Sequence, residues 1–462
     1  MKISLSVVVS ALTLIGGVTS QSNSRCSTDL YERRNIRNYS GSDFAAFRST
    51  YLKVHKLGWF GWFTYIHKTL YDALHETAEF LPWHRRYITE VELTMRYYDK
   101  SFTLPYFDSN SDCKDPASSV IFRSDFFGGN GRDGDRCITN GLAAGLQFEV
   151  PNTKCLQRDF TRDEKFNLPI ERWQCPEEMS TSIDNSRNFF DISFVLEYGV
   201  HAKVHNNIGG DMINPHSPND FIFFMHHANI DRLWLKYQNK QNNNNKYDYT
   251  SRDGDKGRRV SINDDLSLFS EPIINNFDVG YGFNCYKYDD TYPVFRRGDS
   301  NMKKRQDSTN SALTDKIKSV PQMNLASILD ADTLAEFFPS LVKDSTEVTT
   351  NLLPSTISPT ADSVADTLLQ PMLQAPSPNS NTTTSDGFQA IRPQTISAKN
   401  GTAIRPKAAS VPDDLKYPLP NRIPESYIVM MHMSKENFEI QYQRELKLAN
   451  ALNAAGYISP YI

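Results

Sequence analysis

A stretch of the chain between residues 199 and 235 restricts the possible folds and functions more than any other feature. Within it, His201 and His205 stand at positions i and i+4, so on a helix both imidazoles leave the same face. His227 follows an apolar run that is typical of the buried start of a second helix. Asp231 stands one turn after His227, where we expect its carboxylate to orient the imidazole ring. The pattern predicts three imidazoles that converge on a metal ion from two packed helices.

A second group of histidines lies upstream, between residues 63 and 87, and contains His67, His75 and His84. With ten histidines in 462 residues, about 0.2 pairs at the i, i+4 spacing arise by chance, so one pair alone is weak evidence. Two separate groups of three make a stronger case and indicate two metal ions. A donor set made only of imidazole suits copper or zinc better than magnesium or calcium. The lack of a carboxylate disfavours a non-haem iron site.

Two motifs resemble the copper signatures of the superfamily that contains tyrosinases, catechol oxidases and haemocyanins, the type 3 copper proteins. The first is Phe80-Leu-Pro-Trp-His84-Arg85, and the second runs from Asp220 to Asp231. The resemblance covers residues 26–292 and looks strongest to the fungal secreted members. It implies a mainly α fold, in which an antiparallel four-helix bundle holds a binuclear copper site and carries long disulfide-held loops. The implied cofactors are two copper ions, and the implied partners are small phenolic substrates and O2.

The same resemblance assigns the metal ligands. In the family, the third ligand of the second copper stands four residues before an Asp, which selects His227 over His226 because Asp231 follows at that distance. His67 is preferred to His55 because it completes a Phe-x-x-x-His pattern on a helix. The expected ligands of the first copper are His67, His75 and His84, and those of the second copper are His201, His205 and His227.

The resemblance implies oxidation of o-diphenols to o-quinones by O2, with Glu197 as the catalytic residue. Glu197 stands one turn before His201, and in the family a glutamate at this place holds a water near the coppers. The alternative for Glu197 is an ion pair with Lys203 or with another cation. Ala202 stands where efficient monophenol hydroxylases of the family often carry Asn, so we expect catechol oxidase activity with weak hydroxylation. Phe221 replaces a Pro that the family usually has after the Asp, and this change removes no ligand.

Three other functions remain open on the sequence. The first is a full tyrosinase, a monophenol monooxygenase that is made as a proenzyme. The second is a haemocyanin-like O2 carrier, which uses the same six histidines but shields its copper ions. The third is a secreted glycoprotein that kept the fold without the activity. The intact set of histidines argues against the third, and a single chain of this size argues against the carrier.

We expect the chain to have four parts. Residues 1–20 combine a basic start, an apolar run and small residues, as a signal peptide does, and the run is short for the alternative of a membrane anchor. Residues 21–293 form the copper domain, residues 294–413 a largely disordered linker rich in Ser, Thr and Pro, and residues 414–462 a helical extension. The protein is therefore expected to be secreted and to have no membrane span. A net charge of −4 without a basic run gives no indication of a nucleic-acid partner.

Secretion agrees with the six cysteines, which all lie in the region of resemblance. An even number in an exported chain predicts three disulfides, whose pairing the sequence leaves open. A bridge between Cys26 and Cys285 would tie the two ends of the copper domain together. Asn38, Asn381 and Asn400 begin N-glycosylation sequons.

Helices are expected over residues 42–55, 83–99, 189–207 and 435–455. Residues 109–188 are expected to form a disulfide-held excursion with little regular structure, either as a wall of the substrate site or as a passive insertion. Residues 209–218 are expected to form a loop over the second copper. The C-terminal extension either plugs the active site until it is removed, as in fungal relatives, or binds a partner. Lys303-Lys304-Arg305 suits a processing protease.

Overall fold

The computed structural model describes residues 24–26, 29–162, 168–240, 246–293, 329–337, 412–413, 416–430 and 433–459. The expected signal peptide, most of the expected linker with its basic cleavage sequence, and the sequons at Asn381 and Asn400 lie outside these residues. Among the described residues, no helix is both long and apolar enough to cross a membrane.

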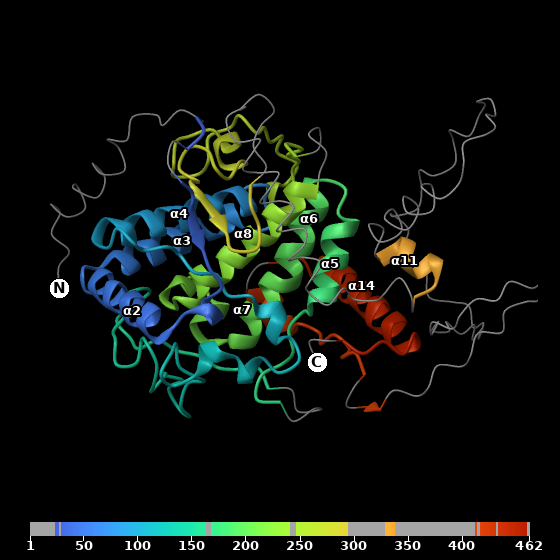
Figure 1. The fold of residues 1–462 in the computed structure, drawn as a ribbon, viewed down its shortest axis with the longest axis horizontal. Coiled ribbons are helices and arrows are strands. Elements are labelled where there is room, and N and C mark those ends of the chain that lie inside the picture. Colours follow the sequence, from blue (N-terminus) through green and yellow to red (C-terminus); the bar gives the residue numbers. More distant parts are fainter. Residues whose placement is uncertain are drawn as a thin grey trace, which may run out of the picture.

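The copper-domain part of the chain is mainly helical (Figure 1). Its helices are α2 (Gly41–Lys56), α3 (Trp59–Leu74), α4 (Phe80–Tyr98), α5 (Pro176–Asn185), α6 (Phe189–Val195), the π-helical turn η5 (Leu196–His201), α7 (Ala202–Ile208) and α8 (Ile222–Lys240). Short 3-10 turns are η1 (Ile36–Asn38), η2 (Ser109–Asp112), η3 (Pro116–Ser118), η4 (Val120–Phe122), η6 (Gly210–Ile213), η7 (Ser217–Asn219), η8 (Asp253–Asp255) and η9 (Ile273–Asn276). The described strands are β1 (Tyr31–Arg33) and β2 (Tyr286–Tyr288), and the C-terminal helices are α11 (Ala331–Phe337), α13 (Glu425–Met430) and α14 (Lys435–Ala454).

The bundle that the resemblance implied is formed by α3, α4, α8 and the continuous rod of α6, η5 and α7 (Figure 1). In α4, the buried residues His84, Ile88, Val91 and Met95 recur at the spacing of one helical face. Helix α8 is buried along nearly its whole length, as expected of a helix at the centre of a bundle. Helix α2 begins at a capping box between Ser40 and Asp43, which is why it starts one residue before the expected range.

The two ends of the copper domain meet beside the bundle. Strands β1 and β2 lie side by side (Figure 1). They pair in parallel, and the register places Tyr31 opposite Tyr286. Cys26 and Cys285 form a disulfide with an S–S distance of 2.05 Å. The predicted bridge is therefore confirmed, and it closes a loop with a sequence separation of 259 residues.

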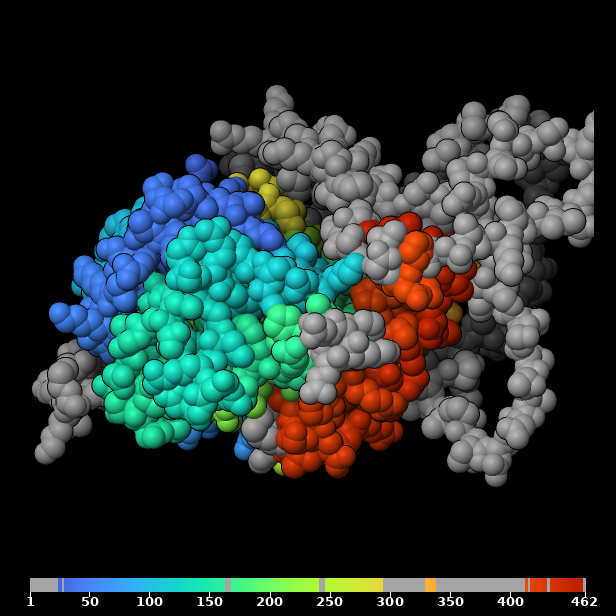
Figure 2. Space-filling view, turned by 90° about the horizontal axis from the view of Figure 1, so that it is seen from below, coloured from blue at the N-terminus to red at the C-terminus, as the bar shows by residue number. Residues whose placement is uncertain are grey.

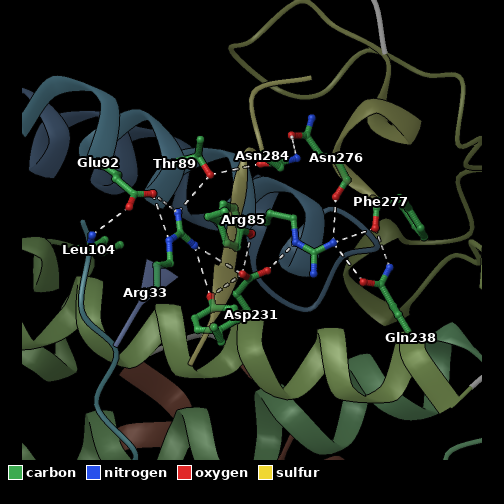
Figure 3. Close-up of polar contacts among 12 residues, drawn as sticks. Arg33, Arg85, Thr89, Glu92, Leu104, Asp231, Gln238, Asn276, Phe277 and Asn284 are labelled. Atoms are coloured by element: carbon green, nitrogen blue, oxygen red, sulfur yellow. Dashed lines mark hydrogen bonds and ion pairs between the residues drawn. The ribbon is translucent and has the colours of Figure 1, made fainter. Parts of the chain in front are cut away.

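Asp231 lies at the centre of a buried group of charged and phenolic side chains (Figure 3). Its Oδ1 atom accepts a hydrogen bond from Arg85 Nε at 2.5 Å, and its Oδ2 atom accepts from the hydroxyls of Tyr286 at 2.6 Å and Tyr288 at 2.5 Å. The prediction that Asp231 orients His227 is therefore wrong, because the Asp231 carboxylate faces Arg85 and strand β2. Tyr286 and Tyr288 are both buried, so this segment closes the core beside α8.

Two arginines extend this group across the bundle. Arg33 donates to Glu92 Oε2 from Nε at 3.0 Å and from Nη2 at 2.6 Å, and its guanidinium lies 3.4 Å from the centre of the Tyr286 ring. Arg85 donates to Gln238 at 3.1 Å. We call the whole group the bundle network; its members are Arg33, Arg85, Glu92, Asp231, Gln238, Tyr286 and Tyr288.

The excursion over residues 109–188 has more regular structure than expected. Its described parts, residues 109–162 and 168–188, contain three 3-10 turns and the helix α5, which begins with Pro176 and a capping box to Glu178. The sequence did not predict this helix because it is short and follows a stretch rich in turn-forming residues. Two disulfides hold the excursion, as predicted, and they are Cys113–Cys175 and Cys137–Cys155.

The C-terminal segment, residues 416–459 as far as they are described, packs against the bundle. Figure 2 shows its orange and red surface in direct contact with the green and cyan part of the core. The predicted helix is confirmed as α14, which has Ser434 as its N-cap. Its Glu445 forms a buried ion pair with Lys203 of α7 and accepts hydrogen bonds from Gln174 and from Gln441. We call these four residues the tail network.

Candidate metal centre

The first group of histidines comes together at one end of α3 and α4. His67 lies within α3, His75 caps the end of that helix, and His84 lies in the first turns of α4. The ring centres lie 5.3 Å (His67 to His75), 5.6 Å (His67 to His84) and 5.2 Å (His75 to His84) apart. One nitrogen from each ring lies within 4.8 Å of the other two, as a shared ion requires.

The second group meets between the α6–α7 rod and α8. His201 ends the π-helical turn η5, His205 lies on α7, and His227 lies on α8. The ring centres lie 4.5 Å (His201 to His205), 5.0 Å (His201 to His227) and 5.7 Å (His205 to His227) apart. These rings also offer one nitrogen each within 4.8 Å of one another. Among the described residues, these two triads are the groups with such geometry.

The two triads adjoin. The rings of His84 and His227 stack with their centres 4.2 Å apart, and those of His75 and His201 lie 5.8 Å apart. His67 and His227 each belong to a triad, whereas neither His55 nor His226 does. The six predicted ligands are thus brought together as two adjacent sites of three.

Hydrogen bonds fix most of the rings in one orientation. In five of the six, Nδ1 lies at hydrogen-bond distance from a backbone carbonyl oxygen, which leaves Nε2 as the nitrogen with a free lone pair. The pairs are His67 with Pro215 (2.8 Å), His75 with Tyr71 (3.1 Å), His84 with Phe80 (2.7 Å), His201 with Glu197 (3.3 Å) and His205 with Met212 (2.5 Å).

The nitrogens that face the triads have the environment of metal ligands. The Nε2 atoms of His67, His84 and His201 are buried without a hydrogen-bond partner. The Nε2 atoms of His205 and His227 face each other at 3.5 Å, and Nδ1 of His205 already uses its proton on a carbonyl. Buried polar atoms without partners are costly unless something else satisfies them, and a cation in each triad does so. The residues present therefore fit two metal ions.

Burial also keeps these imidazoles neutral. It lowers the pKa of His67 to about 3 and that of His205 to about 4, and it lowers the pKa of the other four ligands well below the usual range. Neighbouring rings add to the effect, since two charged imidazoles repel. A neutral imidazole is the form that binds a metal, so the triads are ready to bind metal at neutral pH.

The rod that carries His201 and His205 is not the uniform helix that was expected over residues 189–207. Between α6 and α7 it passes through the π-helical turn η5, in which Gly199 has φ −92° and ψ −109°. A side chain at Gly199 would meet the Gln174 amide at 2.8 Å, so glycine permits this close approach. The helix prediction is right in extent but wrong in form.

Glu197 is fully buried beside the triads, but its carboxylate is held by groups that the sequence did not indicate. Its Oε1 atom accepts from the Glu76 backbone N–H at 2.8 Å, and its Oε2 atom forms an ion pair with Arg252. Burial raises the pKa of Glu197 to about 6, against the opposing effect of Arg252. Lys203 pairs with Glu445 instead. The catalytic role of Glu197 stays a prediction.

Sequence reasoning missed Arg252, Glu76 and Phe223. Arg252 lies on the loop after α8, far from any motif, and Glu76 takes the left-handed conformation with φ +60° directly after the ligand His75. The ring of Phe223 lies 4.1 Å from that of His227. Of these, only Phe223 had a signal in the sequence, because it lies in the apolar run before His227.

A part of the C-terminal segment covers this region. Tyr427, Ile428, Met433 and Phe438 form a hydrophobic cluster with three residues of the bundle, which are Tyr71, Tyr198 and Ala202. The ring of Tyr71 stacks on that of His75 with the centres 4.1 Å apart. The Ser434 N–H donates to Glu76 Oε1 at 2.8 Å. The Tyr71 ring therefore lies between the tail and His75, a candidate metal ligand.

Several known proteins resemble the central part of this chain. Residues 43–240 match the family model for the common central domain of tyrosinase. The chain is 29% identical over 245 residues to tyrosinase ustQ of Aspergillus flavus, with 49% of this chain and 68% of the relative covered. It is 32% identical over 180 residues to a tyrosinase of Streptomyces glaucescens, with 36% and 64% covered. A polyphenol oxidase structure from Thermothelomyces thermophila aligns with a TM-score of 0.47 and 17% identity over 61% of this chain and 95% of that one.

A helical bundle with two adjacent triads of neutral histidines defines a protein of the type 3 copper class. Residues 43–240 therefore form a tyrosinase-family domain.

Proposed function

We propose that this protein oxidises o-diphenols to o-quinones with O2 as the oxidant. Two diphenols give up four electrons and four protons, and one O2 is reduced to two molecules of water. The observation that carries the proposal is the pair of adjacent triads, each with buried imidazole nitrogens that lack a protein partner. A copper pair bound there supplies the redox chemistry, since imidazole holds copper in both oxidation states. The chain holds the ligands, keeps water out and moves protons.

Glu197 is the group that we propose as the proton acceptor for the incoming phenol. Its pKa of about 6 lies close to the pH at which a general base works best in neutral solution. Ala202, directly after the ligand His201, has no polar group that shares this work. We therefore propose that hydroxylation of monophenols is slow relative to oxidation of diphenols.

We also propose that the C-terminal segment keeps the enzyme latent. Tyr427 is buried in the same hydrophobic cluster as Tyr71, and burial together with the Glu197 carboxylate raises the pKa of its phenol. The tail network adds a buried ion pair that holds α14 against α7. These contacts cover the side of the site that faces Glu197, where a phenol has to enter to reach it.

The experiment uses the full chain loaded with copper, before and after limited proteolysis near Lys304 and Arg305. Quinone formation from catechol and hydroxylation of tyramine are followed, together with the near-ultraviolet absorbance that appears on addition of hydrogen peroxide. We expect catechol turnover to appear only after cleavage, with tyramine hydroxylation at least about 10-fold slower. Equal rates on both substrates would instead establish a full tyrosinase, and no absorbance change in either form would contradict the copper assignment.

Secretion is a further part of the proposal. The three disulfides among the described residues are typical of proteins that fold in an oxidising compartment. Removal of residues 1–20 as a signal peptide would follow, and Asn38 is exposed and available for a glycan. The N-terminal sequence and mass of protein recovered from a culture medium test both points.

A further inference from the structure

The loop between Gly209 and Pro215 contacts one ligand from each triad. The carbonyl oxygen of Met212 accepts from Nδ1 of His205 at 2.5 Å, and that of Pro215 accepts from Nδ1 of His67 at 2.8 Å. One short stretch of main chain therefore orients an imidazole at each of the two metal positions. In contrast, His75, His84 and His201 take their orientation from carbonyls four residues earlier in the chain.

The side chain of Asp211 anchors this loop from inside. Its carboxylate is fully buried and forms an ion pair with Lys154. Nε2 of His216 lies 3.1 Å from Oδ1, and the Gln157 N–H donates to Oδ2 at 3.1 Å. A buried carboxylate with this many partners has one favourable position, because moving it leaves a charge without compensation.

The loop also lies directly against the segment that supplies these partners. The Asp211 N–H donates to the Gln157 carbonyl at 2.9 Å. Gly210 has φ +61°, and a Cβ atom there would lie 2.3 Å from the same carbonyl oxygen, so the close approach requires glycine. Cys155, next to Lys154, is bonded to Cys137. The excursion thus reaches the metal centre through a fixed, disulfide-held contact.

We propose that Asp211 is a positioning residue that couples the two metal positions, by holding the loop that orients His67 in one triad and His205 in the other. Loss of this anchor loosens one ligand at both positions, so both ions leave together. The inference rests on the proposed function only in taking copper as the metal. It also gives residues 109–188 a role at the metal centre. This excursion is then neither a passive insertion nor only a wall of the substrate site.

The test compares full-length Asp211→Asn, Lys154→Gln and Asp159→Asn. Asp159 serves as the matched control, because it lies in the same segment but pairs with Arg136 at a half-exposed position. Each protein is loaded with copper and reduced, and transfer of copper to a Cu(I) chelator is followed with time. We expect about 10-fold faster loss from Asp211→Asn, in one phase that releases both ions. Lys154→Gln should show a smaller increase, and Asp159→Asn should match the wild type.

Release at the wild-type rate from folded Asp211→Asn would overturn the proposal, as would biphasic loss in which one position keeps its ion. Far-ultraviolet circular dichroism and the melting temperature of the metal-free proteins separate this role from a general loss of stability. If Asp211→Asn does not fold, an unchanged release rate in Lys154→Gln overturns the proposal on its own. A wild-type chain that takes up no copper would contradict the proposed function instead, so the two failures are distinguishable.

Discussion

The bundle network and the tail network are both buried groups of charged residues, but they differ in what they join. The bundle network connects β1, α4, α8 and β2, all within the domain that the Cys26–Cys285 bridge closes. The tail network connects α7 to α14, across the contact between the bundle and the C-terminal segment. Removing a partner from the bundle network leaves a charge in the dry interior. Removing the tail takes Glu445 away and opens Lys203 to water at the same moment. The bundle network therefore stabilises the domain at all times, whereas the tail network contributes only while the tail is bound.

The largest effect is expected from Asp231→Ala. The substitution leaves the guanidinium of Arg85 buried without its carboxylate, which costs about 3–5 kcal/mol in the free energy of unfolding. Urea denaturation of the metal-free protein measures this loss. Asp125→Ala, which breaks an exposed pair with Arg123, is the control and should leave the unfolding midpoint unchanged. If both variants behaved alike, the bundle network would not have the permanent role described above.

Glu445→Gln is expected to weaken docking of the tail without unfolding the copper domain. Losing the charge opposite Lys203 costs about 1.5–3 kcal/mol, or roughly 10- to 150-fold in the affinity of the tail for the bundle. Gel filtration after cleavage of the linker shows whether the tail stays bound, and catechol turnover before cleavage shows whether latency is reduced. A variant that keeps its tail and its latency would remove the distinction between the two networks.

A third buried pair, Glu197 with Arg252, belongs to the domain but lies beside the tail contact. With a pKa of about 6, Glu197 takes up a proton as the pH falls below that value, so kcat/KM for catechol should fall on the acid side. Arg252 lowers this pKa, so Arg252→Gln should move the acid limb upward by about one pH unit or more. Arg252→Lys keeps the charge and should restore most of the wild-type profile. A pH profile that is the same in all three proteins would argue against Glu197 as the base.

The smallest effect is expected from Glu439→Gln, on the same helix as Glu445. Glu439 pairs with Arg422 where both side chains are largely exposed to water. Solvent screens such a pair, so neither tail retention nor latency should change measurably. Both residues belong to the tail, so a clear effect would show that contacts within the tail also control its docking, and it would blur the contrast with Glu445→Gln.

The six candidate metal ligands were predictable because they lie on or at the ends of helices, next to recognisable motifs. The i, i+4 spacing of His201 and His205 already places their rings on one face. The role of Asp231 was predicted wrongly, since its position one turn after His227 does not show which side of α8 faces Arg85. Arg252 and Glu76 were not predictable, because loop conformation alone brings them to Glu197. No periodicity in the sequence reveals the extra residue in a π-helical turn.

The position of Glu197 depends on the number of residues in the π-helical turn at Leu196–His201. An α-helix turns by about 100° per residue, so the one additional residue in this turn offsets the upstream face from the downstream face by roughly that angle. A single-residue deletion here would leave His201 and His205 in register with α8. It would also rotate the Glu197 carboxylate away from Arg252 and the Glu76 N–H. A change of one residue in the length of this turn would therefore remove the Glu197 carboxylate from the site, while all six histidines stay in place.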